Sequence, residues 1–295
     1  LALQGSHSLF SLVRFCLSFL LLLIPTVLMG ATLPAVTRFA VKQYSALGMS
    51  VGRLYAVNTL GAVGGVLVVT FVLMERLGLR GSTYAAAAVN LVVAAVAWRW
   101  GRVPVEPSLR TDLPAPARDP VLRLVLVGFG MSGFAALGYE VAWTRVVRVA
   151  FSMASHYEFS LVLAAFLVGL SLGGFLCSRL LRRDIDLLAW FGGAQILLGV
   201  LGVLSLPVLG SLPAIVDQLR SMGPWWAYRG GVFAVSLTVM LGPTLLMGAV
   251  FPLVGRIYIR HLGRVGEGMG TIGGVNGLGA ALGALALAIT TFTTN

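Results

Sequence analysis

The sequence predicts an all-α protein, a polytopic bundle of about eight transmembrane helices that contains a parallel internal repeat. Three observations lead to this fold class. The 295 residues are 58% hydrophobic and only 11% charged, with a mean hydropathy of +0.94. Apolar runs of membrane-spanning length follow one another along the chain, and residues 25–65 align with residues 243–283. This composition lies far from that of soluble domains and excludes a water-soluble enzyme.

Each apolar run is long enough to cross a bilayer as a helix, for which about 20 apolar residues are needed. Seven runs carry no charge, and an eighth, Leu124–Trp143, is interrupted only by Glu140. The seven are Phe15–Thr37, Leu54–Met74, Gly81–Trp98, Phe159–Ser178, Leu187–Val216, Gly230–Gly255 and Gly268–Asn295. Because Leu187–Val216 is longer than one crossing requires, we expect its tail around Pro207–Pro213 to leave the bilayer and turn back as a loop.

A proline- and arginine-rich segment separates three helices from five. It spans residues 99–123, contains five prolines and is typical of an extended polar linker. We therefore expect residues 1–98 to hold the last three helices of a first repeat and residues 124–295 the first five of a second. Since the chain begins at Leu1 without a methionine, we expect it to be a segment of a longer polypeptide.

The basic residues orient the helices. When the loops alternate from side to side, 14 of the 21 Lys and Arg residues fall on the side of the linker and 7 on the other. The positive-inside rule therefore places the linker in the cytoplasm. The net charge of +11 is explained by this orientation and by anionic lipid, so we expect no nucleic-acid partner.

The internal repeat aligns without a gap at a constant offset of 218, with 17 identities in 41 positions. The identities include Pro25/Pro243, Gly30/Gly248, Pro34/Pro252, Arg38/Arg256, Asn58/Asn276, Gly61/Gly279 and Gly65/Gly283. Both copies run in the same topological sense, a helix toward the linker side followed by a helix back, so the repeat is parallel. A parallel repeat relates the two halves of major-facilitator transporters.

Four stretches carry a resemblance to a known family. They are LLLIPTVLMGATLPAVTR, VGRLYAVNTLGA, GYEVAWTR and YEFSLVLAAFLVGLSLGGFL. With them, nearly the whole chain resembles the membrane part of bacterial fused major-facilitator/spermidine synthase proteins. The resemblance implies a major-facilitator-like fold in the bacterial inner membrane. It also implies that a soluble aminopropyltransferase-like domain follows in the full-length chain, although nothing in these residues matches that domain.

Glu140 is the clearest candidate for a functional side chain, because an ionisable group within an apolar span is costly and marks a buried partner or a functional site. The sequence places it near the non-cytoplasmic end of its helix, with Trp143 at the height of the aromatic belt and Arg145 just beyond. Three interpretations stay open: an ion pair with Arg145 or with another helix, a substrate or proton site, and exposure at the interface.

The repeat supplies further candidates. Asn58 and Asn276 occupy equivalent positions, where an amide would bond to a neighbouring helix or line a cavity with Glu140 and Arg145. Small residues at four-residue spacing allow helices to approach closely, and Pro25 and Pro243 can kink the same helix in both copies. The small residues are Gly61, Gly65, Gly270, Gly274, Gly279 and Gly283.

Catalytic and metal-binding patterns are missing from the sequence. His156 and Glu158 are two residues apart and lie on different faces of a helix, so they do not make a metal pair. His156 as an axial ligand of haem or of a pigment stays open. We expect no catalysis, no metal and no cofactor in this segment.

Three functions fit these patterns. The first is small-metabolite transport through a cavity lined by the candidate polar residues. The second is anchoring of an aminopropyltransferase-like domain at the membrane. The third is an accessory or scaffolding subunit of a larger membrane complex, without transport or catalysis of its own. The expected partners are the lipid bilayer and, for the third function, other membrane subunits.

Overall fold

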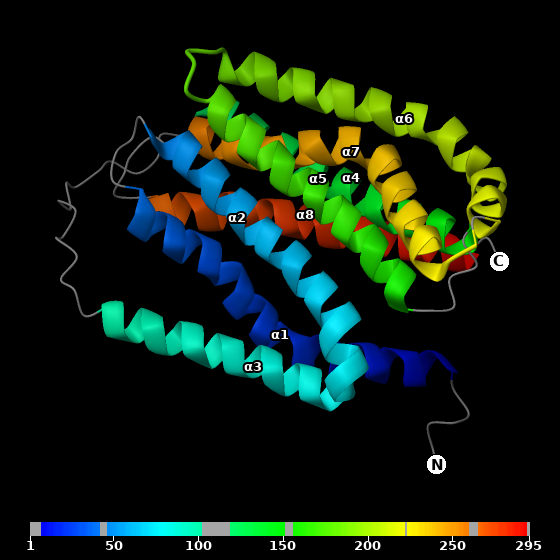
Figure 1. The fold of residues 1–295 in the computed structure, drawn as a ribbon. Coiled ribbons are helices and arrows are strands. Elements are labelled where there is room, and N and C mark those ends of the chain that lie inside the picture. Colours follow the sequence, from blue (N-terminus) through cyan, green and yellow to red (C-terminus); the bar gives the residue numbers. More distant parts are fainter. Residues whose placement is uncertain are drawn as a thin grey trace.

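A computed structural model describes residues 7–41, 46–101, 119–150, 156–221, 223–259 and 265–293. Within these ranges the chain forms helices and no strand (Figure 1). The elements are α1 (His7–Ala40), α2 (Leu47–Val68), the π-helical segment η2 (Val69–Leu73), α3 (Met74–Trp100), α4 (Pro120–Ala150), α5 (His156–Leu180), α6 (Leu187–Arg220), α7 (Trp225–Tyr258) and α8 (Val265–Thr293). The all-helical fold is confirmed, whereas most of the expected linker lies outside the described residues.

The helices identify an integral membrane protein. Within the described residues, seven helical stretches are long and apolar enough to cross a membrane. One of them, Leu47–Trp100, is 54 residues long and includes α2, η2 and α3. Its helical geometry is broken at Gly78, whose φ of 63° lies in the left-handed region that glycine adopts without steric cost. Figure 1 shows the chain reversing direction between α2 and α3.

The expected loop at Pro207–Pro213 is wrong, because α6 continues as a helix from Leu187 to Arg220 with both prolines inside it. In an apolar environment an unpaired backbone group costs several kcal/mol, so a chain that passes a proline stays helical rather than opening into a loop. At about 1.5 Å per residue this helix is about 51 Å long. It curves over the outer side of α7 (Figure 1).

Helix α5 occupies the centre of the bundle. It packs along α7 on one side and along α2 on the other, while α4 pairs with α8 and α6 covers α7. The buried side chains form two clusters. The first includes Leu47, Phe129 and Met269 and lies at the end where α2, α4 and α8 begin, which we call the linker end. The second includes Trp143 and Leu212 and lies at the opposite end.

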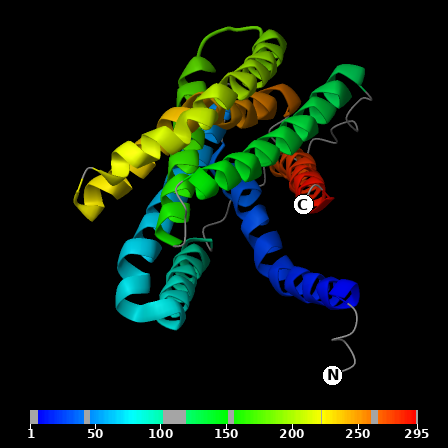
Figure 2. The same ribbon diagram turned by 90° about the vertical axis from the view of Figure 1, so that its right-hand side faces the viewer.

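Helices α1 and α3 are peripheral. The side chains of α1 between Leu12 and Ala31 are exposed, and only its last turns reach α8 and α2. Helix α1 contains Pro25 and is bent away from the bundle toward the N-terminus (Figure 2). Helix α7 contains the matched Pro243 and also bends (Figure 1). Each of these two bent helices therefore contains one of the matched prolines.

The matched glycines of the repeat have different surroundings. A Cβ atom at Gly279 would collide with the carbonyl oxygen of Gly130, and one at Gly283 with that of Phe134, because α8 and α4 cross with their backbones in contact. At the equivalent Gly61 and Gly65 of α2, nothing lies within 4 Å. The same holds for a third pair, since Gly248 of α7 presses on the carbonyl oxygen of Leu170 in α5, while Gly30 of α1 faces open space. The close packing expected of the small residues is therefore present at Gly279 and Gly283 but not at Gly61, Gly65, Gly270 or Gly274. The pair Gly52/Gly270 shows the opposite order, because Gly52 is pressed against Gly174 and Ser178 of α5 and Gly270 has open space.

Candidate functional site

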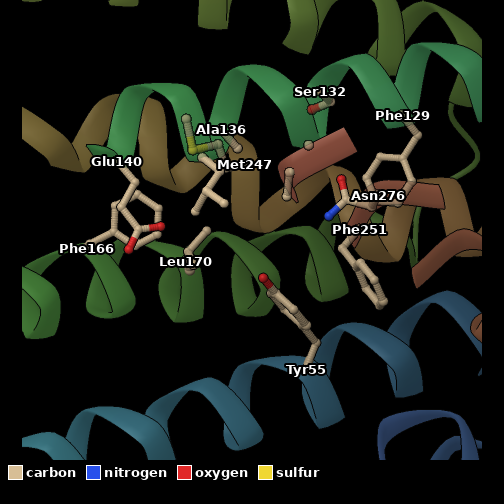
Figure 3. A pocket seen from close by; sticks show the side chains of 13 residues that line it. Tyr55, Phe129, Ser132, Ala136, Glu140, Phe166, Leu170, Met247, Phe251 and Asn276 are labelled. Carbon is tan, nitrogen blue, oxygen red and sulfur yellow. The ribbon is translucent and has the colours of Figure 1, made fainter. Parts of the chain in front are cut away.

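A cavity of about 170 Å³ lies in the middle of the bundle, between the two buried clusters. It is bounded by α2, α4, α5, α7 and α8. Its polar lining consists of Tyr55, Ser132, Glu140 and Asn276, which are labelled in Figure 3. The rest of the lining is apolar and includes Phe129, Phe166, Leu170, Met247 and Phe251.

Glu140 is brought to this cavity by the middle of α4 and lies beside Phe166 and Met247 (Figure 3). Its side chain is half-buried, and no hydrogen bond or ion pair of its carboxylate is formed with the described residues. Arg145, the expected partner, is exposed and does not line the cavity. Five residues along a helix amount to a rotation of about 140° beyond one full turn, so the two side chains leave α4 on different faces. Of the three interpretations of Glu140, the ion pair with Arg145 is not formed.

The two repeated asparagines are placed differently. Asn276 is half-buried in α8 and lines the cavity, where α4 passes so close that a Cβ atom at Gly133 would touch the Asn276 side-chain oxygen. Asn58 lies on an exposed face of α2 and takes no part in the cavity. The structure therefore brings Glu140 and Asn276 together and leaves Asn58 and Arg145 outside.

Sequence patterns did not single out the aromatic part of the site. The ring of Tyr55 stacks on that of Phe251 with 4.9 Å between centroids, and Phe129 packs against Phe251 at 6.0 Å. The Tyr55 hydroxyl points into the cavity (Figure 3). A tyrosine in the middle of an apolar span is a usable signal, because its hydroxyl requires a polar environment when the ring is buried.

Trp143 is not at an aromatic belt, which corrects the expectation from sequence. Only 2% of its surface is exposed, and its ring stacks on Tyr139 with 5.2 Å between centroids. Because it is packed into the buried cluster at the end opposite the linker, this tryptophan faces the core of the bundle instead of the lipid headgroups. The side chain of His156 lies outside the described residues, and its proposed role as an axial ligand is untested. Among the side chains that are described, no group of three or more metal-ligating residues comes together.

A second polar cluster joins η2 and α3 to α5 and α7 at the end opposite the linker, and sequence analysis missed it. The guanidinium of Arg229 lies 4.2 Å from the ring centroid of Tyr157, 4.8 Å from that of Trp225 and 5.8 Å from that of Phe71. The Tyr157 hydroxyl donates a hydrogen bond to Glu75 of α3. Nearby, Thr70 of η2 donates to Ser160 of α5 over 2.8 Å. These contacts hold η2 and α3 against α5 and α7.

Removing the cation from this cluster is expected to weaken the bundle. We expect Arg229→Gln to lower the free energy of unfolding by about 1 kcal/mol, because a cation over aromatic rings contributes about 0.5–1 kcal/mol at a partly exposed site. Thermal unfolding of the purified protein in detergent measures the change. Arg80→Gln, at an exposed arginine of α3, is the matched control and should leave the unfolding temperature unchanged. An equal effect of the two substitutions would contradict the role of Arg229.

Comparisons with protein-family models, with curated proteins and with solved structures found no match to this chain. Membership of the fused major-facilitator/spermidine synthase family therefore stays a prediction that depends on the quoted motifs. The cavity is the feature of the molecule from which a function can be argued.

Proposed function

We propose that this chain is the membrane domain of a small-molecule transporter with a major-facilitator-like architecture, similar to the transporter-like part of fused major-facilitator/spermidine synthase proteins. The observation that carries the proposal is the central cavity, which is walled by helices of both repeats and contains a carboxylate without a protein partner among the described residues. Ionisable groups placed in this way within membrane helices mark substrate or ion pathways. A site between two repeat-related units is also where transporters of this class bind their substrates.

We propose that the chain crosses the membrane eight times. The continuous stretch Leu47–Trp100 would be about 81 Å long as one helix, against a hydrocarbon layer of about 30 Å. The break at Gly78 divides it into two crossings, which adds one to the seven helical stretches. With this count and the distribution of arginines, the linker lies in the cytoplasm. The resemblance to bacterial fused major-facilitator/spermidine synthase proteins implies that the membrane is a bacterial inner membrane.

We also propose that further helices complete the first repeat. Gly30, Gly61 and Gly65 face open space, although their counterparts Gly248, Gly279 and Gly283 are pressed against α5 or α4. Lipid tails do not require glycine, whereas closely packed transmembrane helices do. Helices equivalent to α4 and α5 would cover these positions in the first repeat, as in the two similar halves of a major-facilitator protein.

Cysteine labelling tests transport without knowledge of the substrate. In a variant with Cys16→Ser and Cys177→Ala, a single cysteine is introduced at the cavity by Ser132→Cys or by Ala136→Cys. A transporter that opens to each side in turn should react with a membrane-impermeant thiol reagent in right-side-out vesicles and also in inside-out vesicles. Leu91→Cys, on the exposed surface of α3, is the control and should react in neither preparation.

Labelling from neither side, or from one side only, would contradict transport. It would favour a second candidate, an accessory or scaffolding subunit. That candidate is supported by the broad apolar surface of α1 and α3, where large side chains such as Leu21 (77% exposed) and Leu91 (71% exposed) have little contact with the rest of the chain. A membrane anchor for an aminopropyltransferase-like domain would likewise show no labelling at the cavity.

A further inference from the structure

We propose that the central cavity binds a small organic cation whose positive charge is paired with Glu140. The inference rests on the proposed function in one respect, since a ligand reaches the cavity only if the cavity opens to water. It goes further by naming the chemical class of the ligand.

The charge of the lining points to a cation. Glu140 is the only charged side chain among the described residues that line the cavity. The basic residue nearest to it on α4, Arg145, is exposed and outside the lining. A carboxylate in an apolar surrounding is strongly favoured by an opposite charge, because a low dielectric strengthens the attraction between them. A cationic ligand would supply the charge that the protein does not.

The rings of the cavity support the same class. Tyr55, Phe129, Phe166 and Phe251 all contribute to the wall, and Tyr55, Phe251 and Phe129 form a continuous aromatic group on the side away from Glu140 (Figure 3). Aromatic faces attract organic cations, above all where water is excluded, and they also accept an alkyl body. An anion would meet Glu140 and the negative faces of these rings, and both would repel it.

The size and the remaining polar groups limit the ligand further. A volume of about 170 Å³ admits a molecule of a few heavy atoms and is smaller than the sites that hold drug-sized ligands, about 300–1,000 Å³. The Asn276 amide, the Ser132 hydroxyl and the Tyr55 hydroxyl lie apart from Glu140 and can bond to a hydroxyl of the ligand. Small amino alcohols combine both features.

The test uses two cations and their uncharged isosteres. Radiolabelled choline and radiolabelled ethanolamine are titrated onto the purified protein in a maltoside detergent. Unlabelled 3,3-dimethylbutan-1-ol, the isostere of choline, and propan-1-ol, the isostere of ethanolamine, are then used as competitors. We expect saturable binding of at least one cation. Half-displacement of that radiolabelled cation should need a concentration of the neutral isostere at least about tenfold higher than of the unlabelled cation, because the two competitors differ only in charge.

Two variants assign the charge to Glu140. Glu140→Gln should weaken cation binding at least about tenfold and remove the preference for the cation over its neutral isostere. Glu140→Asp keeps the negative charge and should retain part of that preference. Asp217→Asn neutralises an exposed carboxylate on α6 outside the cavity and should bind like the unmodified protein. Competition by the neutral isosteres equal to that by the cations in the unmodified protein would overturn the proposal even if Glu140→Gln does not fold. Unchanged cation binding by Glu140→Gln, or no saturable binding of either cation, would also overturn it.

The result is separable from the test of transport. Saturable binding that depends on Glu140, together with labelling of the cavity cysteines from one side only, would uphold the ligand class and contradict transport. Labelling from both sides without any preference for the cations would uphold transport and overturn the ligand class.

Discussion

Gly283→Leu is expected to lower the free energy of unfolding by about 3 kcal/mol or more and to prevent much of the protein from folding. The first atom of the new side chain would overlap the carbonyl oxygen of Phe134. A backbone oxygen inside a helix cannot move aside as the end of a side chain can, so α8 would have to separate from α4. The fraction of protein that elutes as a single species after heating in detergent measures the loss.

The matched control is Gly65→Leu, at the equivalent position of the first repeat. In residues 1–295 expressed without the helices proposed to complete the first repeat, nothing lies within 4 Å of this glycine, so the same substitution should change the free energy of unfolding by no more than about 0.5 kcal/mol. The two variants have identical chemistry and repeat-equivalent positions and differ only in what faces them. Equal losses in the two variants of this segment would contradict the asymmetry between the two positions.

The helices could be predicted from the sequence because the bilayer imposes a simple length rule. Six of the eight apolar runs lie entirely within one described helix. The run that begins at Leu54 crosses from α2 through η2 into the first residue of α3. The last run lies in α8 except for its final two residues, which are outside the described residues. The length rule gave a wrong prediction where an apolar run is long enough for two different structures. A run such as Leu187–Val216 can end in a loop or continue as a long helix, and the packing of α6 over α7, which the sequence does not display, favours the helix.

The candidate site could be predicted only in part, because sequence gives the position of a residue along a helix but not what lies opposite. Glu140 was identified by its cost in an apolar span, and in the structure it lines the cavity. Asn58 and Asn276 are equivalent in the repeat, and nothing in their local sequences separates the one that lines the cavity from the one that is exposed. Arg229 was counted as a loop charge, because its aromatic neighbours Phe71 and Tyr157 are far away in the chain.

Trp143→Ala is expected to lower the free energy of unfolding by about 3 kcal/mol, the lower end of the range for replacing a buried aromatic side chain by alanine. Trp143 is 2% exposed and packs in the cluster at the end opposite the linker, where α4, α5, α6 and α7 meet. In a membrane the transfer of apolar surface from water contributes little between helices, because lipid is apolar as well. The van der Waals attraction between the indole and the side chains around it stabilises the cluster in lipid as it would in water, and the substitution removes it.

Trp190→Ala separates packing from the general effect of deleting an indole. Trp190 lies on α6 with 49% of its surface exposed, so its removal should cost no more than about 0.5 kcal/mol in the same unfolding measurement. Trp143→Phe should fall between Trp143→Ala and the unmodified protein, because a smaller ring fills part of the space and can still stack on Tyr139. If Trp143→Ala were as stable as Trp190→Ala, the indole would have to face lipid at the aromatic belt, as the sequence alone suggested, and the buried cluster at this end would be wrong.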